Sequence, residues 1–127
     1  MEVLNKAAIK ILKLFGHEDV RTVKPTVGPE QEYFLVDAAA FEQRPDLIYT
    51  GRTLFGARPP KGQELDDHYF GTIRTRVSTY MKDLDEQLWR LGVLSKTKHN
   101  EAAPAQHEMA PIFSDANSAC DSNQLVM

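Results

Sequence analysis

Apolar residues recur every three or four positions in two stretches of the chain, which is the spacing of an amphipathic helix. The first stretch covers residues 2–16 and ends at Gly16, a residue type that commonly terminates helices. The second stretch covers residues 71–91 and is followed by Gly92. Its apolar stripe consists of Ile73, Val77, Tyr80, Met81, Leu84, Leu88 and Leu91. The sequence therefore predicts two helices, each with one face that needs a partner surface.

Residues 22–37 are instead rich in β-branched and aromatic side chains, which favour a strand. The run from Tyr33 to Val36 is apolar at nearly every position, and this predicts burial on both faces. Residues 93–113 are predicted to form two extended pieces interrupted by Pro104 and Pro111.

We expect the strand at about 24–37 to pair antiparallel with the pieces in 93–113. The helix 71–91 should then cover one face of this sheet, because its apolar stripe needs a surface to pack on. The predicted fold class is α+β, with antiparallel strands covered by helices.

The connection between these elements is long. Residues 38–70 are dense in arginine, proline, glycine and aromatic residues, and a short strand pair is expected around Leu47–Leu54. A connection of this length is usually functional or packs on another part of the molecule, although the sequence assigns it no specific role. Asn117 is predicted to cap a last helix that runs to Met127.

Length and composition restrict the class of protein. A chain of 127 residues with 42% hydrophobic and 26% charged residues is typical of one globular domain. The net charge of −3 does not support nucleic-acid binding, and no apolar run is long enough to predict a membrane span. The single cysteine, Cys120, cannot form an internal disulfide, which predicts a cytoplasmic location.

The charges are distributed unevenly. All 15 lysine and arginine residues lie at or before Lys98, whereas the segment from His99 to the end contains only acidic charges: Glu101, Glu108, Asp115 and Asp121. A solvated acidic surface is the usual explanation for such a segment. A cation-binding site is the other.

Glu30 and Glu32 form the first of two carboxylate pairs that favour a cation. Alternate residues of a strand point to the same face, about 6.5 Å apart. Two carboxylates at that distance repel each other by about 2–3 kcal/mol at an effective dielectric constant near 20. Either an exposed edge solvates both groups, or their pKa values rise, or a positive charge lies between them.

Glu101 and Glu108 form the second pair. In one straight strand a separation of seven would place them on opposite faces, but a bend at Pro104 would let both point into the same space. Four converging glutamates would suit Mg²⁺ or Mn²⁺, which prefer oxygen ligands.

Other kinds of site have weaker support in the sequence. Lys98, His99 and His107 could instead form a zinc or nucleophile site, but the chain has neither an H-E-x-x-H motif nor paired cysteines. Its glycines do not form a phosphate-binding motif of the G-x-G-x-x-G or P-loop type.

Two segments resemble motifs of a known family. Val27 to Asp37, with the sequence VGPEQEYFLVD, is similar to the E-x-E strand of glutamine synthetases. Asn100 to Glu108, with the sequence NEAAPAQHE, resembles the second metal motif of that family. Three further segments are similar to its long type III class: Thr50–Ala57, Asp67–Gly71 and Asp121–Leu125. The resemblance covers essentially the whole chain in the correct order.

This resemblance implies an ATP-dependent ligase that joins ammonia to glutamate through a γ-glutamyl phosphate, with Mg²⁺ or Mn²⁺. By residue, it implies that Glu32, Glu101 and Glu108 hold the ion on the glutamate side, and that Glu30 holds the ion on the nucleotide phosphates. It also implies a cytoplasmic homo-oligomer.

The chain is several times shorter than members of that family. We therefore expect residues 1–127 to be a partial catalytic domain, without the N-terminal β-grasp domain and the C-terminal half of the catalytic domain. Such a chain is expected to self-associate, to bind metal weakly and to be inactive alone. The alternatives left open are a non-catalytic folded fragment and a related ATP-dependent glutamate–amine ligase.

Overall fold

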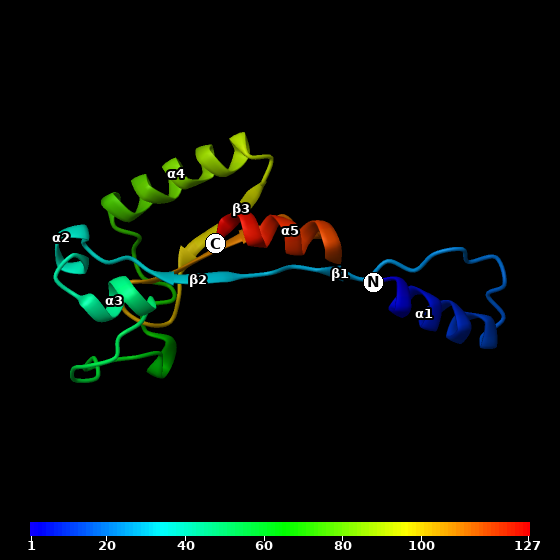
Figure 1. The fold of residues 1–127 in the computed structure, drawn as a ribbon, viewed down its shortest axis with the longest axis horizontal. Helices are drawn as coiled ribbons and strands as arrows, with labels where there is room; N and C mark the ends of the chain where they lie inside the picture. Colours follow the sequence, from blue (N-terminus) through cyan, green and yellow to red (C-terminus); the bar gives the residue numbers. More distant parts are fainter.

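The computed structural model describes residues 1–127, apart from the side chain of Thr97, and combines helices with antiparallel sheet (Figure 1). The predicted α+β class is confirmed. In chain order the elements are α1 (Glu2–Leu14), β1 (Thr26–Val27), β2 (Gln31–Phe34), α2 (Ala38–Phe41), α3 (Pro45–Thr50), the 3-10 helix η1 (Glu64–Asp66), α4 (Thr75–Arg90), β3 (Ser95–Asn100), β4 (Gln106–Pro111), β5 (Ser114–Asp115) and α5 (Ala116–Val126).

The main sheet has three antiparallel strands in the order β2-β4-β3. The first predicted strand therefore pairs with the 93–113 region as expected, although β2 is shorter than residues 24–37. A separate two-stranded ladder joins β1 to β5, with Thr26 opposite Asp115. Both ladders bring the residues around the first glutamate pair against the C-terminal part of the chain.

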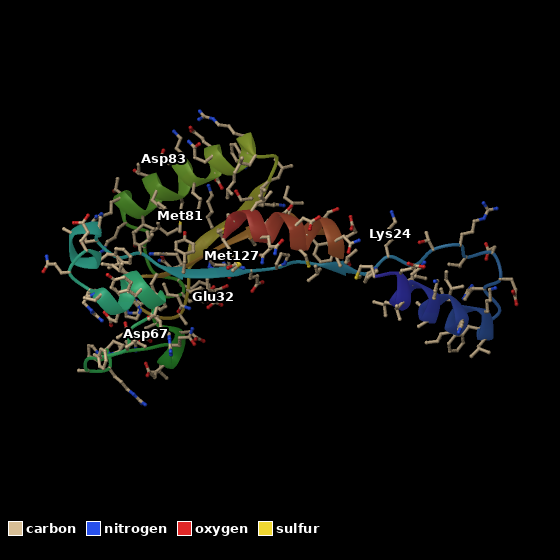
Figure 2. The ribbon with its side chains drawn as sticks, viewed as in Figure 1. Lys24, Glu32, Asp67, Met81, Asp83 and Met127 are labelled. Carbon is tan, nitrogen blue, oxygen red and sulfur yellow. The ribbon has the colours of Figure 1, made fainter. Side chains whose placement is uncertain are left out.

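One face of the three-stranded sheet is covered by α4 and α5 (Figure 1). Leu88 of α4 packs with Val93 and Met109 in the buried core, and Val126 of α5 borders this cluster. Figure 2 shows Met81 on the side of α4 that faces the sheet and Asp83 on the opposite side. The middle of the apolar stripe predicted for residues 71–91 thus lies against the sheet, as expected. The two ends of the stripe lie outside α4: Ile73 precedes the helix, and Leu91 follows it and is 63% exposed.

Polar contacts fix the same two helices. Asp85 of α4 is buried and accepts hydrogen bonds from Ser95 and Lys98 of β3, so a buried carboxylate ties the helix to the edge strand. On the other side, the Gln31 side-chain amide of β2 donates to Asn123 Oδ1 of α5 at 2.8 Å. Loss of Lys98 would be costly, because it would leave the buried Asp85 carboxylate without its charged partner.

Three local expectations were wrong. The strand around Tyr33 is not buried on both faces: exposed and half-buried residues alternate along β2, because helices cover only one side of the sheet. Residues around Leu47–Leu54 form α3 and a loop rather than a strand pair. Pro45 begins that helix, and Gly51, with φ +67°, ends it.

The third error concerns α5, whose cap is Asp115 rather than Asn117. The Asp115 carboxylate accepts from Ser118 N at 3.3 Å and from the Ser118 hydroxyl at 2.8 Å. Because Asp115 is also the last residue of β5, the strand leads directly into the helix.

The first helix extends away from the rest of the molecule (Figure 1). Its link to the following segment includes a hydrogen bond of 2.6 Å from Val23 N to Asn5 Oδ1. Leu14 and Phe15 remain 86% and 75% exposed, so the apolar stripe of α1 contacts little of the chain. None of the described helices combines the length and apolar character that a membrane span requires.

The exposed apolar side chains and open strand edges lead to a prediction about association. Phe34 and Val36 are 59% and 53% exposed, and β2 is an outer strand of the sheet. Because such edges pair readily with other chains, we expect the 127-residue chain to self-associate in size-exclusion chromatography with light scattering. The substitution Phe34→Lys should reduce this association, whereas Ser78→Lys on the exposed side of α4 should not. A monodisperse wild-type monomer at high concentration would contradict the prediction.

Candidate metal centre

The register of the sheet places three polar residues in one row. Glu32 of β2 is opposite Glu108 of β4, and Glu108 is opposite His99 of β3. Directly opposed residues of antiparallel strands share a face, so all three side chains lie on the same side of the sheet. Gln31, next to Glu32, contacts α5, and Figure 2 shows Glu32 on the side of β2 away from that helix. The row therefore lies on the face that the helices leave open.

All four predicted glutamates line one cleft of about 570 Å³ on this face. Glu108 is buried, Glu101 is half-buried, and Glu30 and Glu32 are exposed. His99 lines the same cleft. The structure thus brings together the two carboxylate pairs that lie about 70 positions apart in the sequence.

The hairpin between β3 and β4 allows Glu101 and Glu108 to meet. Gln106 N donates to Ala103 O at 3.2 Å, which closes a turn with Pro104 in its second position. Ala105 follows with φ +60°, a left-handed conformation that a non-glycine residue adopts only at a cost. Glu101 N also donates to Gln106 O at 2.9 Å. The expected bend at Pro104 is therefore a reversal of the chain, with the two glutamates on facing arms.

The orientation of His99 is fixed by the backbone. Its Nδ1 lies 2.7 Å from Asn100 O, and a carbonyl oxygen can only accept, so the neutral ring carries its proton on Nδ1. The lone pair is then on Nε2, which lies 3.5 Å from Glu108 Oε2. Nδ1 is also 3.6 Å from Glu101 Oε1. Two electron-rich atoms, Nε2 and a carboxylate oxygen, thus face each other across a gap that suits a cation or a proton.

The electrostatics of Glu108 reflect this crowding. Burial, followed by a hydrogen bond with Glu101 and the charge of Glu30, together raise the pKa of the Glu108 carboxyl to about 7, while His99 acts in the opposite direction. A carboxylate held among other carboxylates is destabilised unless a positive charge compensates it. One ligand atom each from His99, Glu101 and Glu108 lies within 4.8 Å of the others, which is close enough to share one metal ion.

The alternative site expected from Lys98, His99 and His107 is not assembled. Lys98 and His107 lie on the helix-covered face, where Lys98 pairs with Asp85 and His107 Nδ1 lies 2.9 Å from Asn100 Oδ1. Burial lowers the pKa of the His107 imidazole, which fits a neutral ring in this setting. Only His99 faces the glutamates.

Sequence reasoning missed three residues of the cleft region. His99 was considered only for the alternative site, although its spacing of two from Glu101 places both on one face of an extended segment. Gln106 has the same spacing from Glu108, and its side-chain amide donates to Glu32 Oε2 at 2.7 Å. Tyr69 comes from the long 38–70 connection, and its ring centroid lies 5.1 Å from that of His99. No local pattern indicates the position of Tyr69.

Comparison with known proteins gives the family. Residues 6–127 match the family model described as "Glutamine synthetase, catalytic domain". The chain belongs to the glutamine synthetase family. The resemblance seen in its two glutamate motifs is thereby confirmed.

Three curated relatives agree with this family assignment. The chain is 58% identical over 127 residues to a glutamine synthetase of Butyrivibrio fibrisolvens, covering 100% of this chain and 18% of that protein. It is 49% identical over 125 residues to the type-3 glutamine synthetase of Dictyostelium discoideum, covering 98% of this chain and 17% of the relative. It is also 49% identical over 127 residues to a glutamine synthetase of Bacteroides fragilis (strain YCH46), covering 100% and 17%. The chain thus spans less than a fifth of the length of these relatives.

The raised pKa of Glu108 predicts a pH-dependent stability of the metal-free chain. Because the folded state holds the Glu108 proton up to about pH 7, against an ordinary pKa of 4.5, the free energy of unfolding should fall as the pH rises between these values. Glu108→Gln removes this penalty. We expect it to raise the melting temperature by several degrees at pH 8 and hardly at all at pH 4.

Thermal unfolding followed by circular dichroism measures this difference. Glu86→Gln, an exposed position on α4, serves as the matched control and should change neither value. Equal effects of Glu108→Gln at the two pH values would show that Glu108 is not held as a strained carboxyl.

Proposed function

We propose that this chain contributes part of the divalent-metal centre of a glutamine synthetase, the ATP-dependent ligase that joins ammonia to glutamate. The family assignment supports the activity, and one observation carries the metal centre: four carboxylates and the Nε2 lone pair of His99 face a single cleft. The specific ligands, the ions and the substrates are parts of this proposal.

The donor set fits Mg²⁺ or Mn²⁺. Carboxylate oxygens are the ligands that hard divalent cations prefer, and an imidazole nitrogen is accepted more readily by Mn²⁺ than by Mg²⁺. The Nδ1–H bond of His99 to a backbone carbonyl is the arrangement usual for metal-binding histidines, because it fixes the tautomer and the ring orientation. Cation binding would also relieve the mutual repulsion that raises the pKa of Glu108.

The resemblance of the two glutamate motifs to the family implies two distinct roles for the carboxylates of the cleft. We assign Glu32, Glu101 and Glu108 to the ion on the glutamate side, and Glu30 to the ion on the nucleotide phosphates. Bound ions would neutralise the charge between the ATP phosphates and the acceptor carboxylate. The chain's own residues hold the carboxylate oxygens in place, and the ring of Tyr69 packs beside that of His99.

Manganese binding tests the proposed centre. We expect titration of the 127-residue chain, followed by the paramagnetic signal of free Mn²⁺, to give a Kd weaker than about 1 µM, because the ligand set has few supporting contacts on its exposed side. Glu108→Ala should weaken binding by about tenfold or more. Glu86→Ala, which removes an equal charge on the outer side of α4, should leave the Kd unchanged.

One outcome would count against the proposed centre, and another only against its expected weak affinity. If Glu108→Ala and Glu86→Ala weakened Mn²⁺ binding equally, the ion would be attracted by a diffuse acidic surface rather than bound at a centre. Binding tighter than 1 µM would contradict only the expected weakness, and would mean that these residues alone form a well-supported site.

We predict that the 127-residue chain alone does not make glutamine. Among the described residues that line the cleft, Lys96 is the only lysine or arginine, so charge on a transferred phosphoryl group would be poorly stabilised. Loss of one such electrostatic contact commonly costs about 10²–10³-fold in rate. The check is ammonia-dependent phosphate release from ATP and glutamate, with Glu32→Ala as the control. Turnover that disappears in this variant would overturn the prediction.

The assembly and location follow the same family reasoning. We propose that the chain functions within a homo-oligomer in the cytoplasm. The exposed apolar side chains and the exposed free cysteine, Cys120, support this proposal.

A further inference from the structure

We infer that Gln106 is a positioning residue of the metal centre: it holds one oxygen of Glu32 in place and connects that carboxylate, through Gln63, to the long 38–70 segment. The inference rests on the proposed function, because it concerns how a carboxylate of the centre is oriented. It also gives the 38–70 segment a role that the sequence does not indicate.

The orientation of the Gln106 amide follows from its partners. Its Oε1 accepts from Ala103 N at 3.1 Å, and a backbone N–H can only donate. The other end of the amide must therefore be the nitrogen, and this Nε2 lies 2.7 Å from Glu32 Oε2. The Glu32 carboxylate, which only accepts, thus faces the NH₂ group of Gln106, which only donates. Glu32 keeps its second oxygen for other partners.

Burial makes this arrangement rigid. Gln106 is only 4% exposed, although glutamine is usually a surface residue. A buried amide that loses a partner costs about 1–3 kcal/mol, so alternative side-chain orientations are disfavoured. Glu32 itself is exposed and lies on an outer strand, where a free carboxylate would sample several rotamers. Gln106 supplies the constraint that the strand does not.

Gln63 adds a second support. Its Nε2 donates to Gln106 Oε1 at 3.1 Å, and it immediately precedes η1. The loop around it is tied locally, because Gly62 N donates to the Glu64 carboxylate at 2.6 Å and Lys61 pairs with Asp67. Two residues of η1, Leu65 and Asp66, have positive φ values of 63° and 52°, which indicates a tightly turned loop. The 38–70 segment thus contributes one hydrogen bond, from Gln63, to the buried Gln106 amide.

A double-mutant cycle tests the inference. Gln106→Met keeps the size of the side chain and removes its donor and acceptor. We expect it to weaken Mn²⁺ binding by about tenfold, which is the effect usual for a residue that orients a metal ligand. In a Glu32→Ala background the same substitution should change the Kd by less than about twofold, because the carboxylate it positions is gone. Gln87→Met, at an exposed position on α4, is the matched control.

The outcomes separate positioning from a structural role. If Gln106→Met weakened Mn²⁺ binding equally in both backgrounds, Gln106 would act on the fold rather than through Glu32. An unchanged Kd in the wild-type background would also overturn the inference. If Gln106→Met fails to fold, Gln63→Met at the exposed end of the relay replaces it, with an expected loss of about threefold in the wild-type background only. Absence of Mn²⁺ binding in the wild-type chain would contradict the proposed metal centre itself, a result distinct from either of these.

Discussion

The structure depends on one electrostatic constraint, the alignment of electron-rich groups across the sheet, with the like-charged Glu32 and Glu108 directly opposed. Glu32, Glu108 and the lone-pair nitrogen of His99 are opposed in a single row because of the β2-β4-β3 register. Like charges directly opposite each other destabilise a sheet. A one-residue slip of any strand would remove the conflict by sending a side chain to the other face. The register must therefore be held by contacts elsewhere.

Those contacts lie on the covered face. Met109, next to Glu108 in β4, is almost fully buried against Leu88 and Val93, so a slip would expose it to water. Asp85 holds β3 through Lys98, the residue before His99, and Gln31 holds β2 through α5. In each strand, the residue next to Glu32, Glu108 or His99 is thus anchored to a helix or to the core. The stabilisation of one face is what permits the strained arrangement of the other.

The sequence predicts the parts of this arrangement that depend on local periodicity. The α4 stripe, the strand pairing and the four glutamates follow from spacings of three, four and two, together with a proline that breaks one strand. The residues that orient the site could not be predicted in the same way. His99 shares a face with Glu101 by its spacing of two, but only the β3–β4 register shows that Glu108 lies on that face as well. Tyr69 lines the cleft and Gln63 contacts Gln106 from a connection with no periodicity. The strand pair expected around Leu47–Leu54 was wrong because Pro45 and Gly51 bound a short helix there.

The polarity of the site is set by backbone groups that have only one possible role. Asn100 O can only accept, so it places the proton of His99 on Nδ1 and directs the lone pair of Nε2 toward Glu108. Ala103 N can only donate, so it directs the nitrogen of Gln106 toward Glu32. Both groups belong to the same hairpin, between β3 and β4. The conformation of that hairpin, including the unfavourable φ of Ala105, therefore determines where electron-rich atoms face each other and where a carboxylate is held by a donor.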